Sequence, residues 1–344
     1  MSIPRTVYKM HATGNDFVVY EDSQGNLEPS ADQVRWLCDR HFGVGADGVI
    51  RLAHPRDVSD LDQEAIEGCD RFGCQWFMDY RNADGSLAQM CGNGTRAITL
   101  FAQKQGLAPT MEGSSFLLGT RAGVKRIVSR SPMSDDGGHV FTVNIGAWTM
   151  GPLGGRMVDG GALDGSAPGT LVDMGNPHVV VLAGLGKGPV GSGSDVAGAD
   201  ASSGVSVRNP TPAGLPEAVT TLLSRSDLPD LDELDLEKQP SAHPGLEEGQ
   251  NIEFLRLESM DSQAGRGHAA MRVYERGVGE TLSCGTGLSA SGVVLRALTG
   301  LDHWTIRVGG GVLGVDVDDQ EVHLTGEARL VSRLTLEDIP RNLT

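Results

Sequence analysis

The chain of 344 residues lacks the features of a membrane protein, an exported protein or a disulfide-rich protein. Its longest apolar run is about seven residues, at 179–185, which is too short to cross a bilayer. The opening residues, MSIPRTVYKM, contain no basic segment followed by an apolar one, as a signal peptide would. The five cysteines are sparse and odd in number, so they indicate free thiols and not a disulfide framework. These absences predict a cytoplasmic location.

Positive charge is also scarce: the chain has 28 Lys and Arg residues and 45 Asp and Glu residues, which gives a net charge of −17. This sign opposes phosphate backbones and anionic lipid, so we expect neither nucleic acid nor a membrane surface as a partner. Lysine is rare enough to examine one residue at a time. None of the five lies in a setting suited to a pyridoxal phosphate Schiff base: Lys9, Lys104, Lys125, Lys187 and Lys238.

Aromatic residues are missing between Trp148 and Phe254. Within this stretch, residues 184–214 are rich in Gly, Ser, Ala and Pro, and residues 227–248 are dominated by Asp and Glu. Such a composition buries too little apolar surface to offset the entropy of ordering. We therefore predict a mobile insertion over about 186–248, with one short helix near 215–225 and no catalytic role.

Periodicity and turn chemistry outline the rest of the chain. Ser30 is a plausible N-cap for a helix over 30–41. A second helix is expected after Cys91, ending at Gly106, and residues 54–70 are acidic enough to suggest a surface excursion. Alternating or β-rich runs predict strands at 17–20, 49–52, 76–80 and within 115–147.

An internal repeat indicates two similar halves. Residues 90–98 (MCGNGTRAI) and 283–291 (SCGTGLSAS) share the pattern Cys-Gly-x-Gly-x-x-Ala, and both lead into a predicted helix. A second pair, GNDFVV at 14–19 and GNPHVV at 175–180, occurs in the same order. The longer spacing in the second copy is accommodated by the predicted insertion. The chain is therefore expected to contain two related α/β halves that face each other.

The repeat places Cys91 and Cys284 each at the start of a helix. Free backbone N–H groups and the helix dipole lower a thiol pKa there, and the glycines let the backbone hold a carboxylate or a phosphate. One such cysteine could be a nucleophile, a redox centre, part of an anion cradle, or a small buried core residue. Two of them suggest a ligand between the helix starts, with proton transfer from one face of a carbon to the other.

The other cysteines lack this context. Cys38 is expected in the core of the first helix. Cys69 and Cys74 lie close in sequence, but no matching Cys or His pair accompanies them, so no metal site is predicted.

Six segments in order resemble the diaminopimelate epimerase family: MHATGNDFVVY, NADGS, MCGNGTRA, GNPHVVV, QNIEF and YERGVGETLSCGTG. The matching segments run from residue 8 to about residue 330. The resemblance implies epimerisation of LL- to meso-diaminopimelate without a cofactor, for lysine and peptidoglycan synthesis. It also implies an α/β (α+β) fold of two pseudosymmetric domains, each a curved, mostly antiparallel sheet around a central helix, with the active site in the interdomain cleft.

The same resemblance sets expectations for the domains and the assembly. Residues 1–147, with a C-terminal strand at about 328–344, would form the domain that carries Cys91. Residues 148–327, including the insertion at 186–248, would form the domain that carries Cys284. The family also implies a homodimer and a small-molecule substrate, with no metal and no cofactor.

Functional residues are carried over by motif. Cys91 and Cys284 would be the two acid/base residues, and His178 and Glu275 would tune them. The backbone of Gly92, Asn93, Gly285 and Thr286 would hold the reacting α-carboxylate. Further substrate contacts are implied for Asn15, Asn82, Asn176, Asn251, Glu275 and Arg276. Some family members have a substrate-contacting Gln where this chain has Gly48.

Plainer interpretations stay open beside these roles. The asparagines at 15, 82 and 176 lie in turn-prone strings, and Asn251 could be an ordinary strand residue. His178 could be a buried strand histidine, and Glu275 with Arg276 a surface ion pair. Asp16, Asp84 and Glu280 are expected to hold loops beside the site. A racemase of the same fold acting on proline, or a non-catalytic anion-binding module, are the alternative functions.

Overall fold

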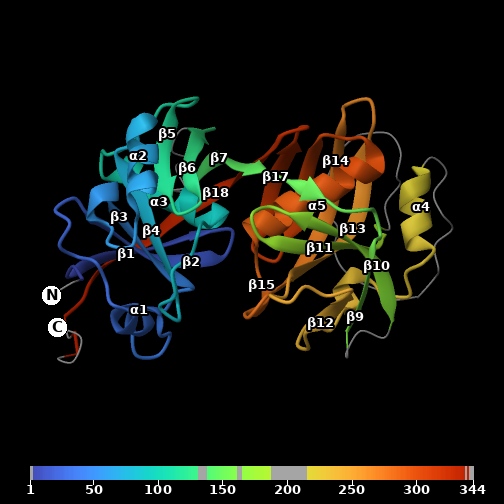
Figure 1. Ribbon diagram of the computed structural model, residues 1–344, viewed down its shortest axis with the longest axis horizontal. Coiled ribbons are helices and arrows are strands. Elements are labelled where there is room, and N and C mark those ends of the chain that lie inside the picture. Colours follow the sequence, from blue (N-terminus) through green and yellow to red (C-terminus); the bar gives the residue numbers. More distant parts are fainter. Residues whose placement is uncertain (1–2, 131–137, 161–164, 187–214, 338, 341–344) are drawn as a thin grey trace.

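The computed structural model describes residues 3–130, 138–160, 165–186, 215–337 and 339–340 (Figure 1). The first half of the chain contributes these strands: β1 (Thr6–Ala12), β2 (Asn15–Asp22), β3 (Gly48–Ala53), β4 (Trp76–Asn82), β5 (Ser115–Thr120), β6 (Gly123–Ser129) and β7 (Gly138–Ala147). Its helices are α1 (Ala31–Cys38), η1 (Pro55–Asp57), α2 (Gln63–Arg71) and α3 (Gly92–Lys104).

The second half contributes these strands: β8 (Thr149–Met150), β9 (Arg156–Gly160), β10 (Ser166–Asp173), β11 (Pro177–Leu185), β12 (Pro240–His243), β13 (Asn251–Asp261), β14 (Arg266–Glu275), β15 (Gly279–Thr281), β16 (His303–Val308) and β17 (Gly311–Val317). Its helices are α4 (Glu217–Leu223), η2 (Leu231–Glu233) and α5 (Gly285–Thr299), and the long strand β18 (Glu321–Thr335) follows.

In the first half the strands close into a ring around α3. β1 pairs antiparallel with β2, β2 parallel with β3, β3 antiparallel with β4, and β4 parallel with β5. β5, β6 and β7 continue as an antiparallel series. β18 then pairs with both β7 and β1, which closes the ring.

The second half repeats this order of pairings around α5. β10 pairs antiparallel with β11, β11 parallel with β13, β13 antiparallel with β14, and β14 parallel with β16. β16, β17 and β18 continue antiparallel, and β8, which follows β7, pairs with β10. The fold is therefore mixed α and β with a mostly antiparallel sheet, and the duplicated order agrees with the repeat in the sequence.

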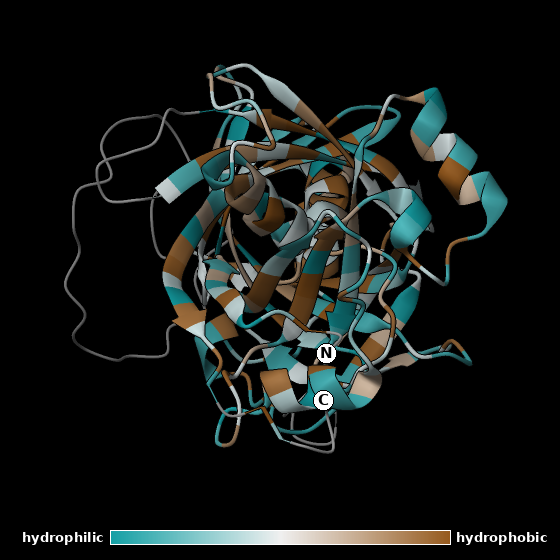
Figure 2. Cartoon of the chain, turned by 90° about the vertical axis from the view of Figure 1, so that its left-hand side faces the viewer, coloured by the Kyte–Doolittle hydropathy of each residue, from teal (hydrophilic) through white to brown (hydrophobic). Residues whose placement is uncertain are grey.

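Both central helices are buried on nearly every side, because each is enclosed by strands. α5 lacks a charged face and is built largely of small and aliphatic residues, as a helix buried all round requires. Its Gly292 allows a close approach to β17, since a Cβ there would lie 2.5 Å from Val315 Cγ1. Figure 2 shows the apolar segments gathered inside and the hydrophilic ones on the outer helices. Within the described residues, no helix is both long and apolar enough to span a membrane.

Several local predictions are confirmed. Ser30 caps α1 through a capping box with Gln33, and Cys38 is buried at the end of that helix. The predicted strands at 17–20, 49–52 and 76–80 lie within β2, β3 and β4. The end of β18 returns to the first half, where residues 329–335 pair with β1.

Two compositional predictions need correction. Residues 54–70 are not simply a surface excursion, because they form η1 and most of α2, and Cys69 is buried. In the predicted insertion, residues 187–214 lie outside the described residues. The short helix expected near 215–225 is confirmed as α4, but the residues up to 248 also form η2 and β12. Leu231, Leu234 and Leu236 are buried there, so the acidic stretch does bury apolar surface. Its few leucines pack in one core cluster with Val181 and Phe254.

Candidate active site

The N-termini of α3 and α5 meet at the junction of the two halves. Cys91 is the N-cap of α3 and Cys284 is the N-cap of α5. A Cβ on Gly285 would lie only 3.4 Å from the Cα of Gly92, so the two helix starts are in contact. The free N–H groups and the positive dipole ends of two helices therefore converge beside two sulfur atoms.

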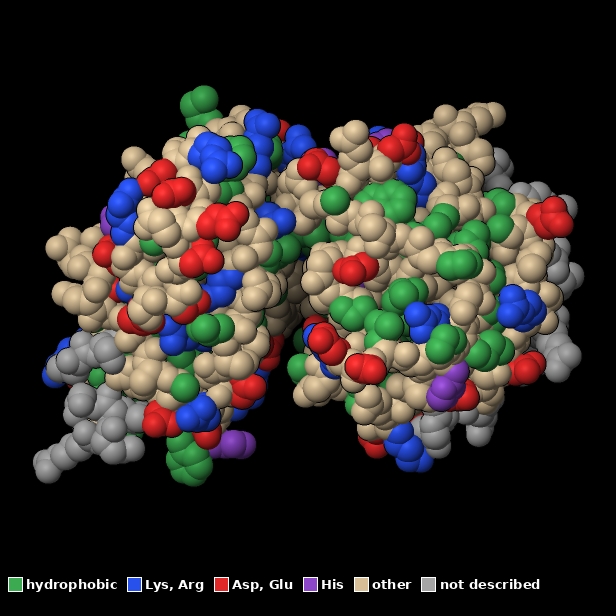
Figure 3. All heavy atoms as spheres, viewed as in Figure 1, with side chains coloured by type: hydrophobic (Ala, Val, Ile, Leu, Met, Phe, Trp, Pro, Cys, Tyr) green, Lys and Arg blue, Asp and Glu red, His purple; other side chains and the backbone are tan. Residues whose placement is uncertain are grey.

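A cavity of about 990 Å³ opens beside these helix starts and takes its walls from both halves. Figure 3 shows the surface hollowed between the two halves. The cavity is lined by most of the residues that the sequence predicts: Asn15, Asn82, Cys91, Gly92, Asn93, Asn176, Glu275, Arg276, Cys284, Gly285 and Thr286. His178 and Asn251 do not line it and lie behind its wall.

Cys91 is held between an amide and a helix start. Its Sγ lies 3.5 Å from Asn15 Oδ1, which accepts from the thiol, and 3.4 Å from the N–H of Gly94, which donates to the sulfur. Burial raises the pKa of the Cys91 thiol to about 11, although the N–H groups of Gly94 and Asn93 oppose this shift. At neutral pH in this state the Cys91 side chain is a thiol.

Two carboxylates act on the thiol of Cys284. Its Sγ lies 3.6 Å from Thr286 Oγ1. Burial, followed by the carboxylates of Glu275 and Glu253, raises the pKa of the Cys284 thiol well above its ordinary value. Burial also raises the pKa of Glu275, whose carboxyl accepts a hydrogen bond from Thr281. Both cysteines are thus thiols that strongly resist ionisation.

This result corrects the expectation that the helix starts lower the cysteine pKa values overall. The N–H groups act in the predicted direction at both sulfur atoms. Desolvation is larger, because both thiols are enclosed where two halves meet. Sequence shows the helix start but does not show the depth of the surrounding cavity.

Three of the predicted asparagines present their amides to the cavity. Asn15 Nδ2 donates to Asp47 Oδ2 over 2.7 Å, which turns its Oδ1 toward Cys91. Asn82 belongs to a turn, with its Nδ2 3.0 Å from Ser86 Oγ, and still lines the cavity. Asn176 Nδ2 lies 3.5 Å from Thr286 Oγ1. A turn position and a place in the cavity wall are therefore compatible.

Glu275 and Arg276 do not form an ion pair with each other. Arg276 is exposed, and its Nη1 donates to the carbonyl of Glu248 over 2.8 Å. Asn251 supports this residue from behind, because its Oδ1 accepts from the Arg276 N–H over 2.9 Å. His178 is fully buried and its Nδ1 lies 2.7 Å from Glu253 Oε1.

The residues expected to hold loops do so. Asp16 bonds both Lys9 and Arg40 at the rim of the cavity. Burial alone would raise the pKa of Asp16, but these two cations hold it at about 2. Asp84 accepts from the Ser86 N–H.

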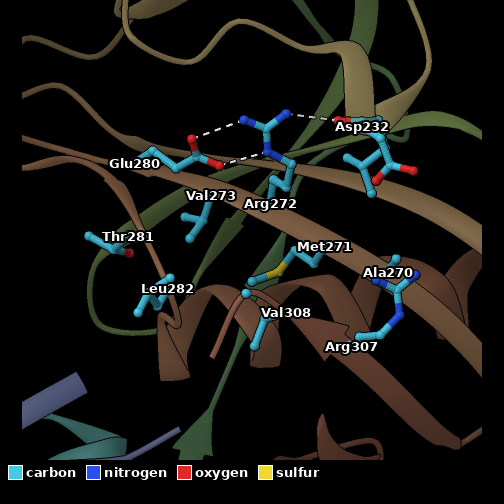
Figure 4. Close-up of a pocket in the computed structure, with 12 residues that line it drawn as sticks. Asp232, Ala270, Met271, Arg272, Val273, Glu280, Thr281, Leu282, Arg307 and Val308 are labelled. Carbon is cyan, nitrogen blue, oxygen red and sulfur yellow. Dashed lines mark hydrogen bonds and ion pairs between the residues drawn. The ribbon is translucent and has the colours of Figure 1, made fainter. Parts of the chain in front are cut away.

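Glu280 forms a double hydrogen bond with Arg272, as Figure 4 shows. These residues line a second, smaller hollow of about 400 Å³ beside β14 and β16. The close-up draws the side chains around it. Arg272 is fully engaged there, since it also donates to the carbonyls of Leu231 and Leu234. Thr281 and Leu282 separate this hollow from the larger cavity and line both.

Gly48 leaves no room for the glutamine of some family members. A Cβ on Gly48 would lie 2.5 Å from Tyr80 Cε2. Tyr80 itself lines the cavity. The Tyr80 ring therefore occupies the space in this chain.

Sequence reasoning missed several residues of the site. Asp47 and Arg40 line the cavity and bond each other over 2.8 Å. The family resemblance implies a role for the backbone of Asn93 and none for its side chain. It donates to Ser283 O over 3.1 Å and to Asn15 Oδ1 over 3.3 Å, and so connects the two halves. The signal was present, since Asn93 lies inside the repeated motif. Among the described residues, no cluster of three or more His, Cys, Asp or Glu side chains could hold a metal ion.

Comparison with known proteins agrees with this architecture. The family model described as diaminopimelate epimerase matches residues 7–150 and 213–331. Diaminopimelate epimerase of Mycolicibacterium smegmatis is 36% identical over 339 residues, covering 96% of each chain. That of Thermobifida fusca is 33% identical over 325 residues, covering 94% of this chain and 95% of the relative. A hydroxyproline epimerase from Agrobacterium vitis shares the fold, with a TM-score of 0.55 at 15% identity over 97% of this chain and 93% of that one. The chain belongs to the diaminopimelate epimerase family.

Proposed function

We propose that this protein interconverts LL- and meso-diaminopimelate without a cofactor, with Cys91 and Cys284 as the two acid/base residues. The observation that supports this most directly is the contact between two helix starts, each capped by a cysteine, beside one cavity. The relatives named diaminopimelate epimerase cover nearly the whole chain. The product serves lysine and peptidoglycan synthesis.

The substrate would place its reacting amino acid group between the two sulfur atoms. The N–H groups of Gly92, Asn93, Gly285 and Thr286 would hold the α-carboxylate and stabilise the enolate-like charge that develops when the α-proton leaves. The polar wall supports recognition of a second amino acid group at the far end of the ligand. Arg276 suits a carboxylate there, and the amides of Asn82 and Asn176 can serve both ammonium and carboxylate.

Because both cysteines are thiols in the free protein, one of them must first lose its proton to solvent. In the proposed step, the resulting thiolate takes the α-proton and becomes a thiol again. The electron pair of the broken C–H bond moves onto the α-carbon and its carboxylate. The second cysteine thiol gives its proton to the opposite face of that carbon and becomes a thiolate. No redox change occurs, and the reverse reaction exchanges the two roles. His178 and Glu275 would tune the sulfur atoms, Glu275 by its proximity to Cys284.

Two substitutions test the acid/base pair. Cys91→Ala and Cys284→Ala should each abolish epimerisation in D₂O while the protein stays folded, as circular dichroism can check. Cys69→Ala is the matched control, because Cys69 lies in a separate core cluster and should leave turnover intact. Full epimerisation by either cysteine variant would refute the two-base scheme.

The substrate is tested separately. Purified protein under reducing conditions should convert LL-diaminopimelate without added cofactor, and proline and trans-4-hydroxyproline serve as comparison substrates. Turnover of proline in preference would identify the alternative racemase. Binding without turnover, unaffected by replacing either cysteine, would identify an anion-binding module.

We further propose that residues 1–147 with 328–344, and residues 148–327, act as two domains, and that Asn251 holds Arg276 beside the substrate. A homodimer and a cytoplasmic location rest on the family resemblance and the composition. Sedimentation of the purified protein tests the first, and cell fractionation tests the second.

A further inference from the structure

Arg96 is a fully buried arginine in the second turn of α3. Its hydrogen bonds reach the two cysteines only through other residues. Its Nη2 donates to Asn93 Oδ1 over 2.7 Å and to Thr13 Oγ1 over 2.8 Å. Because Oδ1 of Asn93 accepts this bond, its Nδ2 must turn the other way. That nitrogen meets Asn15 Oδ1 and the carbonyl of Ser283. Arg96 thereby selects the amide orientation that joins the two halves.

The positive charge of the Arg96 guanidinium also lacks a neutralising partner among the described residues. Within the part of the chain that the structure describes, its Nε and Nη1 have no hydrogen-bond partner and no carboxylate pairs with it. A buried, unpaired charge is destabilising, and proteins retain few of them without a use. Burial lowers the pKa of Arg96 to about 10, so the side chain still carries its charge at neutral pH. β18 makes room for it, because a Cβ on Gly326 would lie 3.1 Å from Arg96 Cζ.

Among the described residues, the group with which this charge interacts electrostatically is the sulfur of Cys91. The second motif offers no counterpart, because Ser289 stands where the first motif has Arg96 and merely bonds the carbonyl of Gly285. Around Cys284 the neighbouring charges are instead the carboxylates of Glu275 and Glu253. Glu275 also raises the pKa of Cys91, but there the buried cation of Arg96 acts against it.

We propose that Arg96 is a positioning residue that orients Asn93 across the junction and supplies the buried positive charge that favours the thiolate at Cys91. The proposal rests on the proposed function, since it assigns Cys91 the first proton abstraction of the cycle. Cys284, beside two acidic side chains, then starts as the proton donor. The two thiols thus differ in how readily they ionise, in part through one position of the repeat.

Alkylation of Cys91 by iodoacetamide tests the electrostatic part without any substrate. It is measured by peptide mass spectrometry in a Cys284→Ala background, with and without Arg96→Met. An opposite charge nearby shifts a pKa by about 1–3 units. Loss of the guanidinium should therefore slow alkylation at pH 8 about tenfold or more. Arg96→Lys keeps a charge and should restore most of the rate. Arg126→Met, which removes an exposed arginine from β6, is the matched control and should change nothing.

Turnover and stability separate positioning from a structural role. In the full enzyme, Arg96→Met should lower kcat at least tenfold and change KM less, while the thermal midpoint stays near that of the wild type. Wild-type alkylation in Arg96→Met would overturn the proposal, and so would equal slowing in Arg126→Met. If Arg96→Met does not fold, Arg96→Gln against Arg96→Lys makes the same comparison of charge. Failure of the wild type to epimerise diaminopimelate would refute the proposed function and leave the alkylation result standing.

Discussion

Gly310 provides a sharp test of how the two halves position the site. It lies between β16 and β17 and touches the backbone of the other half. A Cβ at Gly310 would lie 1.8 Å from the carbonyl oxygen of Thr13, whereas real Cβ atoms keep about 3.0 Å. In Gly310→Ala the two segments must therefore separate by about 1.2 Å. The displaced segment leads directly into Asn15, which contacts Cys91.

The expected effect on catalysis is larger than the effect on stability. A displacement of about 1 Å at a reacting group can lower the rate about 100-fold. Overpacking of this kind lowers the free energy of unfolding by about 1–3 kcal/mol. We therefore expect kcat/KM for diaminopimelate to fall about 100-fold while the variant still unfolds cooperatively in urea.

Gly68→Ala is the matched control, because nothing lies within 4 Å of a Cβ at that position in α2. It should leave kcat/KM unchanged and stabilise the protein by about 0.5–1 kcal/mol, as Ala does in helix interiors. A Gly310→Ala enzyme with wild-type kcat/KM would refute the reasoning, because the contact would then be irrelevant to the position of Asn15.

Three further predictions concern the first half. Asp22→Ala removes one carboxylate from a buried network in which Asp22 pairs with the fully buried Arg51, so urea unfolding should show a loss of about 3–5 kcal/mol. Gly48→Gln should destabilise the protein and raise KM, because the new side chain collides with Tyr80; tighter substrate binding measured by calorimetry would contradict this. Cys91, with its pKa raised by burial to about 11, should be alkylated about tenfold faster with each pH unit between 7 and 10, because the thiolate is the reactive form. A plateau in that rate below pH 9 would show that the thiol is less shielded than its burial implies.

Much of the fold could be predicted because the repeated motifs consist of residues that favour helix starts, and this preference is local in sequence. Both Cys-Gly-x-Gly motifs precede helices, and the pairing order around each helix is the same. Average composition predicted the structure less well in the acidic stretch at 227–248, where a few apolar residues make the core contacts. Leu231 and Leu234 are buried among acidic neighbours, and no average over the segment reveals such spacing.

The candidate site also has properties that the sequence predicts and others that it does not. Motifs identify the residues that line the cavity, because turn and helix-start chemistry is local in sequence. They do not reveal burial, which reverses the expected ionisation of Cys91. They also do not reveal which amide faces which partner, as with Asn93, because its contacts lie in the other half of the chain. Such properties arise only when distant segments meet.

β18 has a consequence for how the protein is made. Its final residues pair with β1, and its earlier residues pair with β7 and β17. During synthesis, the ring of strands around α3 therefore stays open until β18 has left the ribosome. Until then, one edge of β1 and one edge of β7 are unpaired. Open edges of this kind invite intermolecular pairing. Contacts between such distant segments also form slowly. Fragments that end before β18 should therefore aggregate.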